Sequence, residues 1–375
     1  EGMGETVPIA APTGRAAKRI SELTGCEAKT IHRLLEVDHT AADSTRFLHN
    51  AKNPLKCDVI VIDEMSMVDV LLFQSLLNAL KPSCRIIMVG DEDQLPSVGA
   101  GNVLASVIAS GLVPVVRLKE IFRQAAQSLI ISNAHRIVEG LPPQKGTRDS
   151  DFFQLECPTA EACAALVCDL VARRLPQSYG YDPFEDIQVL CPTKMGPVGT
   201  QALCTALQQR LNPPAAHKAE LKLYDKVLRT GDKVMQVRND YDIPFTRPGG
   251  GEDGAGAFNG DMGVIEAVDP REGSVTVRSE DRRLVYSGEA LRELELAYAI
   301  TIHKSQGSEF AAVVVPLFDV PPRLCYRNLL YTGVTRAKDL CILAGHAAEA
   351  AGMVQNAMRN KRFSKLAQML KGEGI

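Results

Sequence analysis

Two adjacent carboxylates, Asp63 and Glu64, are the residues of this sequence that are best placed to do chemistry. They follow the apolar, β-branched run VIVI at 59–62, which is typical of a buried strand in a parallel sheet. Nucleoside triphosphatases present a magnesium ligand and a water-orienting base at the end of such a strand. The pair therefore indicates phosphoryl transfer. A solvated turn before a helix capped by Ser66 or Asp69 would also account for these residues.

A second polar cluster follows the next apolar run along the chain. The segment RIIMVGDEDQLPSVGAGNVL at 85–104 closes a strand-like run on Gly90 and Asp91 and then carries Gln94. Neighbouring parallel strands end at the same edge of a sheet, and ligands of open α/β sheets bind at that edge. The two motifs in this order therefore indicate one phosphate site more strongly than either motif alone.

Short apolar runs alternate with helix-like stretches in two sets, which predicts βαβ units and parallel sheets covered on both faces. In the first set, strands are expected at 7–12, 58–63, 85–90 and 113–118, and helices at 14–24, 68–80 and 101–110. In the second set, strands are expected at 186–192, 311–317 and 339–345, and helices at 198–212 and 324–336. The pattern predicts two α/β domains.

The pattern changes between about Gly231 and Leu294, where short alternating runs are separated by turn residues. This predicts a small antiparallel barrel, with a core that includes Met235, Val237, Val264, Val275 and Val277. The glycine-dense stretch at 247–261 neither follows a parallel strand nor opens a helix, so it is predicted to be a flexible loop rather than a phosphate site. The polar residues 36–56 are predicted to form a short insertion in the first domain.

The composition limits the class of protein. With 375 residues, of which 45% are hydrophobic and 23% charged, the chain is long enough for two or three globular domains. No apolar run reaches the roughly 18 residues of a membrane helix, and no secretory signal is evident, so a cytoplasmic protein is expected. The net charge of −3 restricts any DNA contact to a local patch. The 10 scattered cysteines lack zinc spacing and are expected to be reduced.

At this level the sequence resembles the superfamily 1B DNA helicases of the RecD type, which include the alpha subunit of exodeoxyribonuclease V. The matching segments follow in order along nearly the whole chain: AAPTGRAAKRI (10–20), TIHRLL (30–35), VIDEMSMVD (61–69), GDEDQLPSVGAG (90–101), LKEIFRQA (118–125), GDKVMQVRNDY (231–241), FNGDMGVI (258–265), AYAITIHKSQGSEF (297–310) and LLYTGVTRAK (329–338). Chance does not produce so many matches in one order.

The resemblance implies two RecA-like parallel-sheet motor domains with a small SH3-like β-barrel inserted in the second. The expected limits are 1–120 for the first motor domain, 121–228 with 296–375 for the second, and 229–295 for the barrel. The insertion at 36–56 falls where such enzymes carry a β-hairpin that separates the duplex. A plain loop fits its short polar sequence almost as well.

The resemblance also implies that ATP and Mg²⁺ are the cofactors. Asp63 would hold the magnesium ion, Glu64 would orient the attacking water, and Gln94 would sense the γ-phosphate and report it to the DNA track. Two arginines, Arg123 in EIFRQ and Arg336 in GVTRAK, would reach the γ-phosphate from the second domain. An arginine supplied in this way accelerates phosphoryl transfer on the order of a thousandfold or more.

Single-stranded DNA is the partner that the resemblance implies, together with duplex junctions and, as a further expectation, other subunits of a recombination complex. Hydroxyls, a lysine and backbone amides position a strand without reading its sequence. Either histidine alone would be a satisfied structural residue, and Gly307 and Glu309 would face the nucleotide instead. The residues expected at the DNA are Thr13, Gly14, Arg15, Thr30, His32, Thr301, His303, Lys304, Ser305 and Gln306.

The sequence lacks the phosphate-binding loop that Asp63 and Glu64 need as a partner. Such a loop reads Gly-x-x-x-x-Gly-Lys-Ser/Thr, because small residues let backbone amides surround the phosphates and the lysine bridges two of them. No Gly-Lys dipeptide occurs in the chain, and APTGRAAKR at 11–19 fits the DNA-contacting motif better. We therefore expect the chain to be a fragment that begins just after this loop and to hydrolyse ATP weakly or not at all by itself.

Two functions of different classes remain open from the sequence. The first is an ATP-dependent DNA helicase that moves 5′ to 3′ on single strands, with a role in repair and recombination. The second is a non-catalytic DNA-binding or scaffold subunit of a recombination complex in which the missing loop is natural. The presence of all five candidate catalytic residues favours the first. A nuclease is not indicated, because no further carboxylate cluster with a lysine is present.

Overall fold

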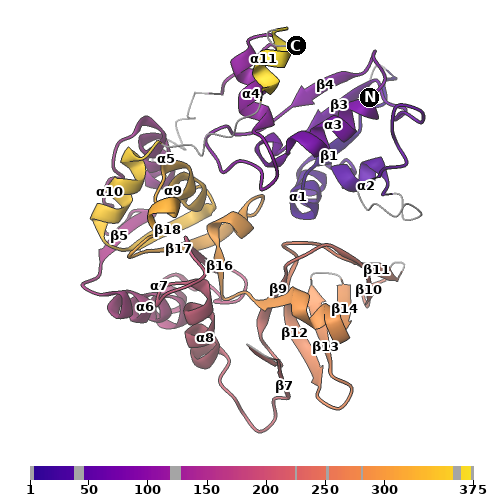
Figure 1. Ribbon diagram of the computed structural model, residues 1–375. Helices are drawn as coiled ribbons and strands as arrows, with labels where there is room; N and C mark the ends of the chain where they lie inside the picture. Colours follow the sequence, from indigo (N-terminus) through magenta and orange to yellow (C-terminus); the bar gives the residue numbers. More distant parts are fainter. Residues whose placement is uncertain are drawn as a thin grey trace. The chain divides into compact units, whose positions relative to one another are not determined.

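The computed structural model describes residues 4–37, 46–118, 128–223, 226–250, 253–279, 282–357 and 365–372. Contacts within the chain divide it into two compact units, residues 1–121 with 358–375 and residues 122–357. Each unit contains a parallel sheet with its own hydrophobic core. Figure 1 shows the elements of both units.

The first unit is built on a parallel sheet with the strand order β2-β1-β3-β4. The strands are β1 (Ile9–Ala11), β2 (Ala28–Thr30), β3 (Val59–Ile62) and β4 (Arg85–Met88). Its helices are α1 (Gly14–Thr24), α2 (Ile31–Leu35), α3 (Val70–Asn78), α4 (Val103–Ser110) and α11 (Leu366–Leu370). The alternation of strands and helices expected for the first domain is therefore present in this part of the chain.

The buried strand β3 lies inside this sheet, between β1 and β4. Ile60 and Ile62 are fully buried and pack in one core with Ile31, Leu35 and Leu76 of the surrounding helices. An apolar run that is buried on both faces is what a strand in the middle of a parallel sheet requires. The strand prediction for residues 58–63 is confirmed to within one residue at each end.

The strand expected at 113–118 is not formed in the structure. Residues 112–118 have no assigned strand, and Val116 and Leu118 are 87% and 96% exposed. Strand β4 ends the described sheet on one side, and its Ile87 and the following Val89 are 51% and 48% exposed. The prediction was wrong because β-branched composition stabilises a strand only where a neighbouring strand pairs with it, and the described residues offer none to 112–118.

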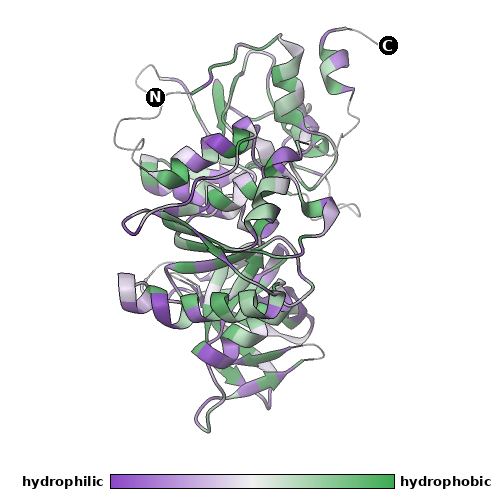
Figure 2. Cartoon of the chain, turned by 90° about the vertical axis from the view of Figure 1, so that its left-hand side faces the viewer, coloured by the Kyte–Doolittle hydropathy of each residue, from purple (hydrophilic) through white to green (hydrophobic). Residues whose placement is uncertain are grey.

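The second unit contains a parallel sheet with the strand order β16-β6-β17-β18-β5. The strands are β5 (Phe152–Glu156), β6 (Ile187–Cys191), β16 (Ala299–Thr301), β17 (Phe310–Leu317) and β18 (Ala337–Gly345). Helices α5 (Leu129–Glu139), α9 (Arg327–Val334) and α10 (Ala347–Gln355) cover one face, and α6 (Ala160–Asp169), α7 (Leu175–Tyr179) and α8 (Thr200–Leu211) cover the other (Figure 1). Figure 2 shows mostly hydrophobic strands between helices that carry both hydrophilic and hydrophobic residues.

The second unit also contains a seven-stranded sheet of the order β11-β10-β14-β13-β12-β9-β15, with antiparallel pairing throughout. Its strands are β9 (Lys233–Gln236), β10 (Asp240–Thr246), β11 (Gly254–Ala257), β12 (Met262–Asp269), β13 (Ser274–Ser279), β14 (Arg282–Ser287) and β15 (Leu294–Leu296). A separate hairpin joins β7 (Glu220–Lys222) and β8 (Val227–Arg229). The antiparallel architecture expected between the halves of the second α/β domain is confirmed.

Two details of this antiparallel sheet differ from the sequence expectation. Met235, Val275 and Val277 are buried as expected, whereas Val237 and Val264 are only partly buried. The glycine-dense stretch is not a loop throughout, because β11 lies inside it and pairs with β10. A Cβ added at Gly254 would lie only 3.0 Å from the ring of Phe245. The absence of a side chain at Gly254 therefore lets β11 pair closely with β10.

Asp232 ties the antiparallel sheet to the parallel sheet of the same unit. Its fully buried carboxylate accepts hydrogen bonds from Gln208 Nε2 (2.6 Å), Asn212 Nδ2 (2.7 Å) and the Arg229 backbone N (2.7 Å). The Tyr298 hydroxyl donates a fourth bond of 2.9 Å just before β16. A buried carboxylate with four donors holds α8, the start of β9 and the start of β16 in one arrangement.

The predicted domain limits remain a prediction. The position of the C-terminal helix differs from them. Helix α11 packs on α4 in the first unit, and Leu366 contacts the core of that unit, whereas the expected limits placed all of 296–375 in the second domain. Part of the insertion at 36–56 lies outside the described residues. At its described ends, Val37 and Phe47 form an isolated antiparallel bridge.

Candidate nucleotide and DNA sites

The carboxyl ends of the four strands in the first unit meet at one edge of the sheet. All four strands are parallel, so Thr30 at the end of β2, Thr13 after β1 and Asp63 after β3 follow strand ends on the same side. Gly90 and Asp91 follow β4 at this edge. The topology therefore gathers the candidate magnesium ligand and part of the candidate DNA residues at one edge, as the motif order indicated.

The Asp63–Glu64 turn is held by one hydrogen bond to a side chain and one between backbone groups. Asp63 Oδ1 accepts a 2.8 Å bond from the Glu64 backbone N, and Met65 N donates to Val89 O at 3.0 Å. Glu64 adopts the left-handed backbone conformation, with φ of 53°, which is uncommon for a residue with a side chain. Residues in such conformations cluster at functional sites, where surrounding contacts enforce them.

Gly90 lets strand β4 approach this turn. A Cβ added at Gly90 would lie 3.0 Å from the Met65 backbone N and 3.1 Å from Leu104 Cδ2. Contacts of that length are tighter than ordinary packing allows, so any larger side chain would push the turn away from β4. The glycine between the two polar motifs therefore has a positioning role that its spacing in the sequence did not reveal.

Gln94 lies in the loop that follows β4, where Asp91 organises the backbone. Asp91 Oδ1 accepts a 2.9 Å bond from Asp93 N, and Asp91 Oδ2 accepts a 3.4 Å bond from Gln94 Nε2. The Asp69 side chain caps α3 by accepting from Leu72 N at 2.8 Å. The capping alternative is thus correct for Asp69, and it leaves Asp63 and Glu64 outside the capping interaction.

The candidate DNA residues of the first unit lie at the starts of two helices. Thr13 caps α1 by accepting from Ala16 N, and Thr30 caps α2 by accepting from Arg33 N at 3.1 Å. Gly14 and Arg15 are the first two residues of α1. A capping hydroxyl accepts one hydrogen bond and can donate another to a phosphate oxygen, and helix N-termini favour anions.

His32 lies in α2, near Phe47 and Asp69. Its ring centroid is 5.8 Å from that of Phe47. Burial lowers the pKa of His32, and the charge of Asp69 partly opposes this effect. The imidazole is therefore neutral at pH 7, so a DNA contact through His32 would be a hydrogen bond or a stacking contact rather than an ion pair.

In the second unit, one connecting segment, residues 302–309, joins opposite edges of the parallel sheet. Thr301 at the carboxyl end of β16 pairs with Cys191 on β6, whereas Ala312 near the start of β17 pairs with Ile187. The segment therefore runs from the carboxyl edge of β16 back to the amino edge of β17. It carries most of the candidate DNA and nucleotide residues of this unit.

Lys304 is held by the carboxylate of Glu295, which is not among the predicted site residues. Its Nζ donates to Glu295 Oε2 at 2.7 Å, and Lys194 Nζ lies 3.8 Å from Glu295 Oε1. Burial raises the pKa of Glu295 and the bond from Lys304 lowers it, with lowering as the net direction. No sequence signal pairs residues 295 and 304, because neither helical nor strand spacing connects them.

The remaining candidate DNA residues of this segment differ in exposure. Thr301 and Gln306 are buried, and the fully buried Ser305 donates its hydroxyl to Ile302 O at 2.8 Å. His303 lies 3.5 Å from the Tyr326 hydroxyl, and burial lowers its pKa. Lys304 and His303 are therefore the more exposed of the candidate DNA residues in this segment.

Arg336 lies immediately before β18, at the amino edge of the sheet. It is buried, and its Nη1 donates to Ser308 O at 3.1 Å while Phe310 N donates to Arg336 O at 2.9 Å. Gly307 adopts a φ of 72°, and Glu309 lies 3.9 Å from Lys338 Nζ. Arg123, the other candidate arginine, lies outside the described residues.

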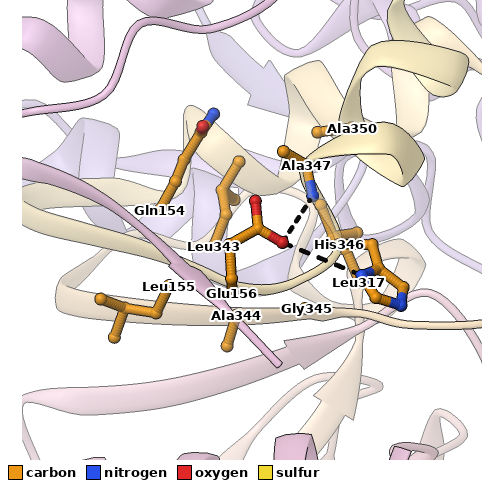
Figure 3. A pocket seen from close by; sticks show the side chains of 10 residues that line it. All are labelled: Gln154, Leu155, Glu156, Leu317, Leu343, Ala344, Gly345, His346, Ala347 and Ala350. Carbon is orange, nitrogen blue, oxygen red and sulfur yellow. Dashed lines mark hydrogen bonds and ion pairs between the residues drawn. The ribbon is translucent and has the colours of Figure 1, made fainter. Parts of the chain in front are cut away.

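A small pocket at the far end of this sheet does not suit a nucleotide. Figure 3 shows its lining from the ends of β5, β17 and β18 and the start of α10, with Glu156 facing His346 and the Ala347 backbone N. Its cavity volume of about 10 Å³ holds a single water at most. None of the predicted site residues lines it.

The described residues contain neither a membrane-spanning helix nor a cluster of metal-ligating side chains. In the part of the chain that the structure describes, no helix is both long and apolar enough to cross a membrane. Within the same residues, no group of three or more His, Cys, Asp or Glu side chains is placed to hold a metal ion. All ten cysteines are free.

Comparison with known proteins gives a solved structure of similar fold and three matching family models. The solved structure of the Pif1 helicase from Bacteroides, in complex with ADP-AlF3 and single-stranded DNA, has a TM-score of 0.53 and 20% identity, covering 93% of this chain and 84% of that one. At this identity the likeness shows the fold. Residues 1–100 match the family described as AAA domain, 203–278 the ATP-dependent RecD-like DNA helicase SH3 domain, and 296–344 the UvrD-like helicase C-terminal domain.

Two characterised relatives identify the family. The chain is 33% identical over 362 residues to the ATP-dependent RecD2 DNA helicase of Deinococcus radiodurans, covering 96% of this chain and 46% of that protein. It is 30% identical over 394 residues to the RecBCD enzyme subunit RecD of Mycolicibacterium smegmatis, covering 98% and 67%. The chain thus spans about half to two thirds of the length of these relatives. It belongs to the RecD-like family of helicases, and the predicted family and fold class are confirmed.

Proposed function

We propose that the full-length gene product is an ATP-dependent DNA helicase that moves 5′ to 3′ on single-stranded DNA, with a role in repair and recombination. The observation that carries the proposal is the edge of the first sheet, where Asp63 and Glu64 follow the buried central strand β3. Family membership supports it, because one relative is named as a DNA helicase and another as a RecBCD subunit. Single-stranded DNA, duplex junctions and other recombination subunits are the proposed partners.

The first unit is proposed to supply the hydrolytic groups. Mg²⁺ is usually held by one or two carboxylates together with phosphate oxygens and water, so the single carboxylate of Asp63 fits as its protein ligand. When bound, the ion neutralises charge on the β- and γ-phosphates of ATP. Glu64 orients the attacking water, and Gln94 contacts the γ-phosphate. Phosphoryl transfer depends on such positioning and charge neutralisation more than on covalent chemistry.

The second unit is proposed to add charge from its amino edge and to contact DNA from its carboxyl edge. Arg336 and, by sequence, Arg123 contact the γ-phosphate, with Gly307 and Glu309 beside the nucleotide. Lys304 and His303 contact the DNA backbone. Because Arg336 donates to Ser308 O in the segment that also carries Lys304, a shift of the arginine moves the DNA contact. This bond offers a physical route from nucleotide state to strand movement.

The substitution Glu64→Gln in the full-length gene product tests the proposal. It preserves the shape of the side chain and removes the carboxylate that orients water. We expect ATP binding within about threefold of the unsubstituted protein, and hydrolysis and unwinding reduced by at least about a hundredfold. Nucleotide binding is measured with a fluorescent ATP analogue, and unwinding with a forked duplex.

The matched control is Glu22→Gln, which changes an exposed carboxylate on α1 that pairs with Lys18 at 3.7 Å. It is expected to leave hydrolysis unchanged. Retained unwinding by the Glu64→Gln protein would remove Glu64 from its proposed role. Absence of DNA-stimulated hydrolysis in the unsubstituted full-length protein would favour the non-catalytic DNA-binding subunit instead.

A further inference from the structure

The loop at residues 192–199, which joins β6 to α8, has no role in the proposed function, yet its backbone is tightly constrained. Gly199 N donates to Gly196 O at 3.0 Å, and Thr200 N donates to Thr193 O at 3.2 Å. A Cβ added at Gly199 would lie 2.4 Å from Met195 O, so only glycine permits this fold of the loop. A loop that uses its own backbone groups in this way presents its side chains in a fixed arrangement.

This loop leaves the sheet beside the segment that carries Lys304. Strands β6 and β16 are parallel neighbours, and Cys191 pairs with Thr301 at their carboxyl ends. Pro192 and Ile302 therefore continue from adjacent strands at the same edge. The first residues of the two connections are neighbours because of the sheet topology, although about 110 residues separate them in the sequence.

Two lysine ammonium groups converge on one carboxylate at this edge. Lys304 Nζ and Lys194 Nζ contact different oxygens of Glu295, at 2.7 Å and 3.8 Å. The Lys194 side chain is 55% exposed, compared with 22% for Lys304. Two cations share one anion, so the cluster keeps a net positive charge. An exposed ion pair is weak and is easily exchanged for a phosphate.

The same loop exposes an apolar side chain next to this charge. Met195 is 66% exposed and directly follows Lys194. A methionine thioether is polarisable and makes favourable contacts with aromatic rings. A cation with an adjacent apolar group on a rigid loop is the combination that binds a nucleic-acid backbone and the face of an unpaired base without reading sequence.

We propose that Lys194 and Met195 form a further contact to single-stranded DNA. Lys194 binds a backbone phosphate next to the one bound by Lys304, and Met195 contacts the face of the adjoining base. Glu295 holds both lysines in place until phosphate oxygens replace it. The inference rests on the proposed function, because it extends the same strand path along the carboxyl edge from β16 to β6.

The test is the affinity of the full-length gene product, without nucleotide, for a fluorescent oligo-dT across a salt series. One phosphate contact on a single strand contributes about 0.7 to the slope of log affinity against log salt. Lys194→Ala is therefore expected to reduce the slope by about 0.7 and the affinity at 0.1 M salt about fivefold. Met195→Ala is expected to weaken binding about threefold without changing the slope.

Lys145→Ala is the matched control. Its ammonium lies 3.9 Å from Glu156 and its side chain is 60% exposed, so it resembles Lys194 in both respects. Glu156 ends β5, at the other end of the sheet from β16. This variant is expected to bind like the unsubstituted protein, whereas Lys304→Ala is expected to lose slope and affinity.

The outcomes separate the two proposals. A Lys194→Ala slope equal to that of Lys145→Ala, in a protein whose unsubstituted form binds with a clear salt dependence, would overturn the inference and leave the proposed function intact. Absence of salt-dependent binding by the unsubstituted protein would overturn the proposed function and the inference with it. A thermal melt of each variant confirms that the fold is unchanged.

Discussion

The two parallel sheets of this protein position their candidate residues in different ways. In the first unit, all of them follow strand ends at one edge, and the contacts that fix them are mostly local, such as Asp63 Oδ1 with Glu64 N. In the second unit, Lys304 follows the carboxyl edge and Arg336 precedes the amino edge, and the connecting segment 302–309 joins them. The first arrangement suits a hydrolytic site, and the second suits coupling between two ligands.

The difference also changes which part of each site depends on distant residues. The Asp63–Glu64 turn follows directly from the strand that precedes it, with Gly90 as its main distant support. The 302–309 segment depends on Glu295, Arg336 and the Asp232 network, which join elements far apart in the sequence. Substitutions that disturb tertiary contacts should therefore affect the second unit more than the first.

The largest expected effect is on ATP hydrolysis, and it tests whether the two edges of the second sheet act separately. Arg336→Ala in the full-length gene product should reduce ATP hydrolysis by about a thousandfold, because the guanidinium that is proposed to neutralise the transition state is lost. Binding of oligo-dT without nucleotide should stay within about twofold, because Lys304 lies at the other edge. Lys338→Ala, two residues away and exposed, is the control. Equal loss of DNA binding and hydrolysis would show that the two edges are not separate.

Removal of the buried carboxylate at Asp232 should destabilise the second unit selectively. Asp232→Ala leaves the donors of Gln208, Asn212 and Tyr298 buried without their acceptor, and we expect a loss of about 3 kcal/mol in unfolding free energy. Hydrogen exchange should show reduced protection in β6 and β16 and unchanged protection in β1 and β3. Asp269→Ala, at an exposed turn, should have little effect. Equal loss of protection in both units would contradict the comparison.

A smaller effect is expected where the first unit depends on a distant contact. Gly90→Ala brings a Cβ to 3.0 Å from Met65 N, so the Asp63–Glu64 turn must move by a few tenths of an ångström. We expect destabilisation of about 1–2 kcal/mol and roughly tenfold slower hydrolysis. Gly249→Ala meets no atom within 4 Å and serves as the control. Hydrolysis unchanged by Gly90→Ala would show that the turn tolerates displacement.

The smallest effect concerns the two histidines among the candidate DNA residues, His303 and His32. Burial alone lowers the pKa of His303, whereas Asp69 partly opposes the lowering in His32. A folded-state pKa below the unfolded value of 6.5 stabilises the protein above pH 6.5, and this stability is lost as the pH falls toward the folded pKa.

Urea unfolding at pH 7 and pH 5 measures this difference. His303→Gln should remove more of the pH dependence than His32→Gln, because among the described residues burial acts on the His303 pKa without the opposing charge that Asp69 supplies at His32. The reverse order would mean that Asp69 does not act on His32 as the structure indicates. Either result shows how the electrostatic environment of His303 in the second unit differs from that of His32 in the first.

Much of the fold could be predicted because it depends on local patterns. The apolar runs that became β3, β6 and β18 are buried on both faces, and that requirement is visible in composition alone. The run at 113–118 has the same composition but no strand to pair with among the described residues, and pairing is not a local property. The prediction of a loop for the glycine-dense stretch was wrong for the same reason, because β11 forms only through its pairing with β10.

The sequence by itself determined the chemistry of the candidate residues, because side-chain type and motif order are properties of the sequence. Tertiary structure alone decided that Gly90 supports the Asp63–Glu64 turn, that Glu295 holds Lys304, and that Lys194 lies beside both. Such contacts arise when strands that are distant in the chain become neighbours. The spacing of residues in the sequence does not indicate which strands become neighbours.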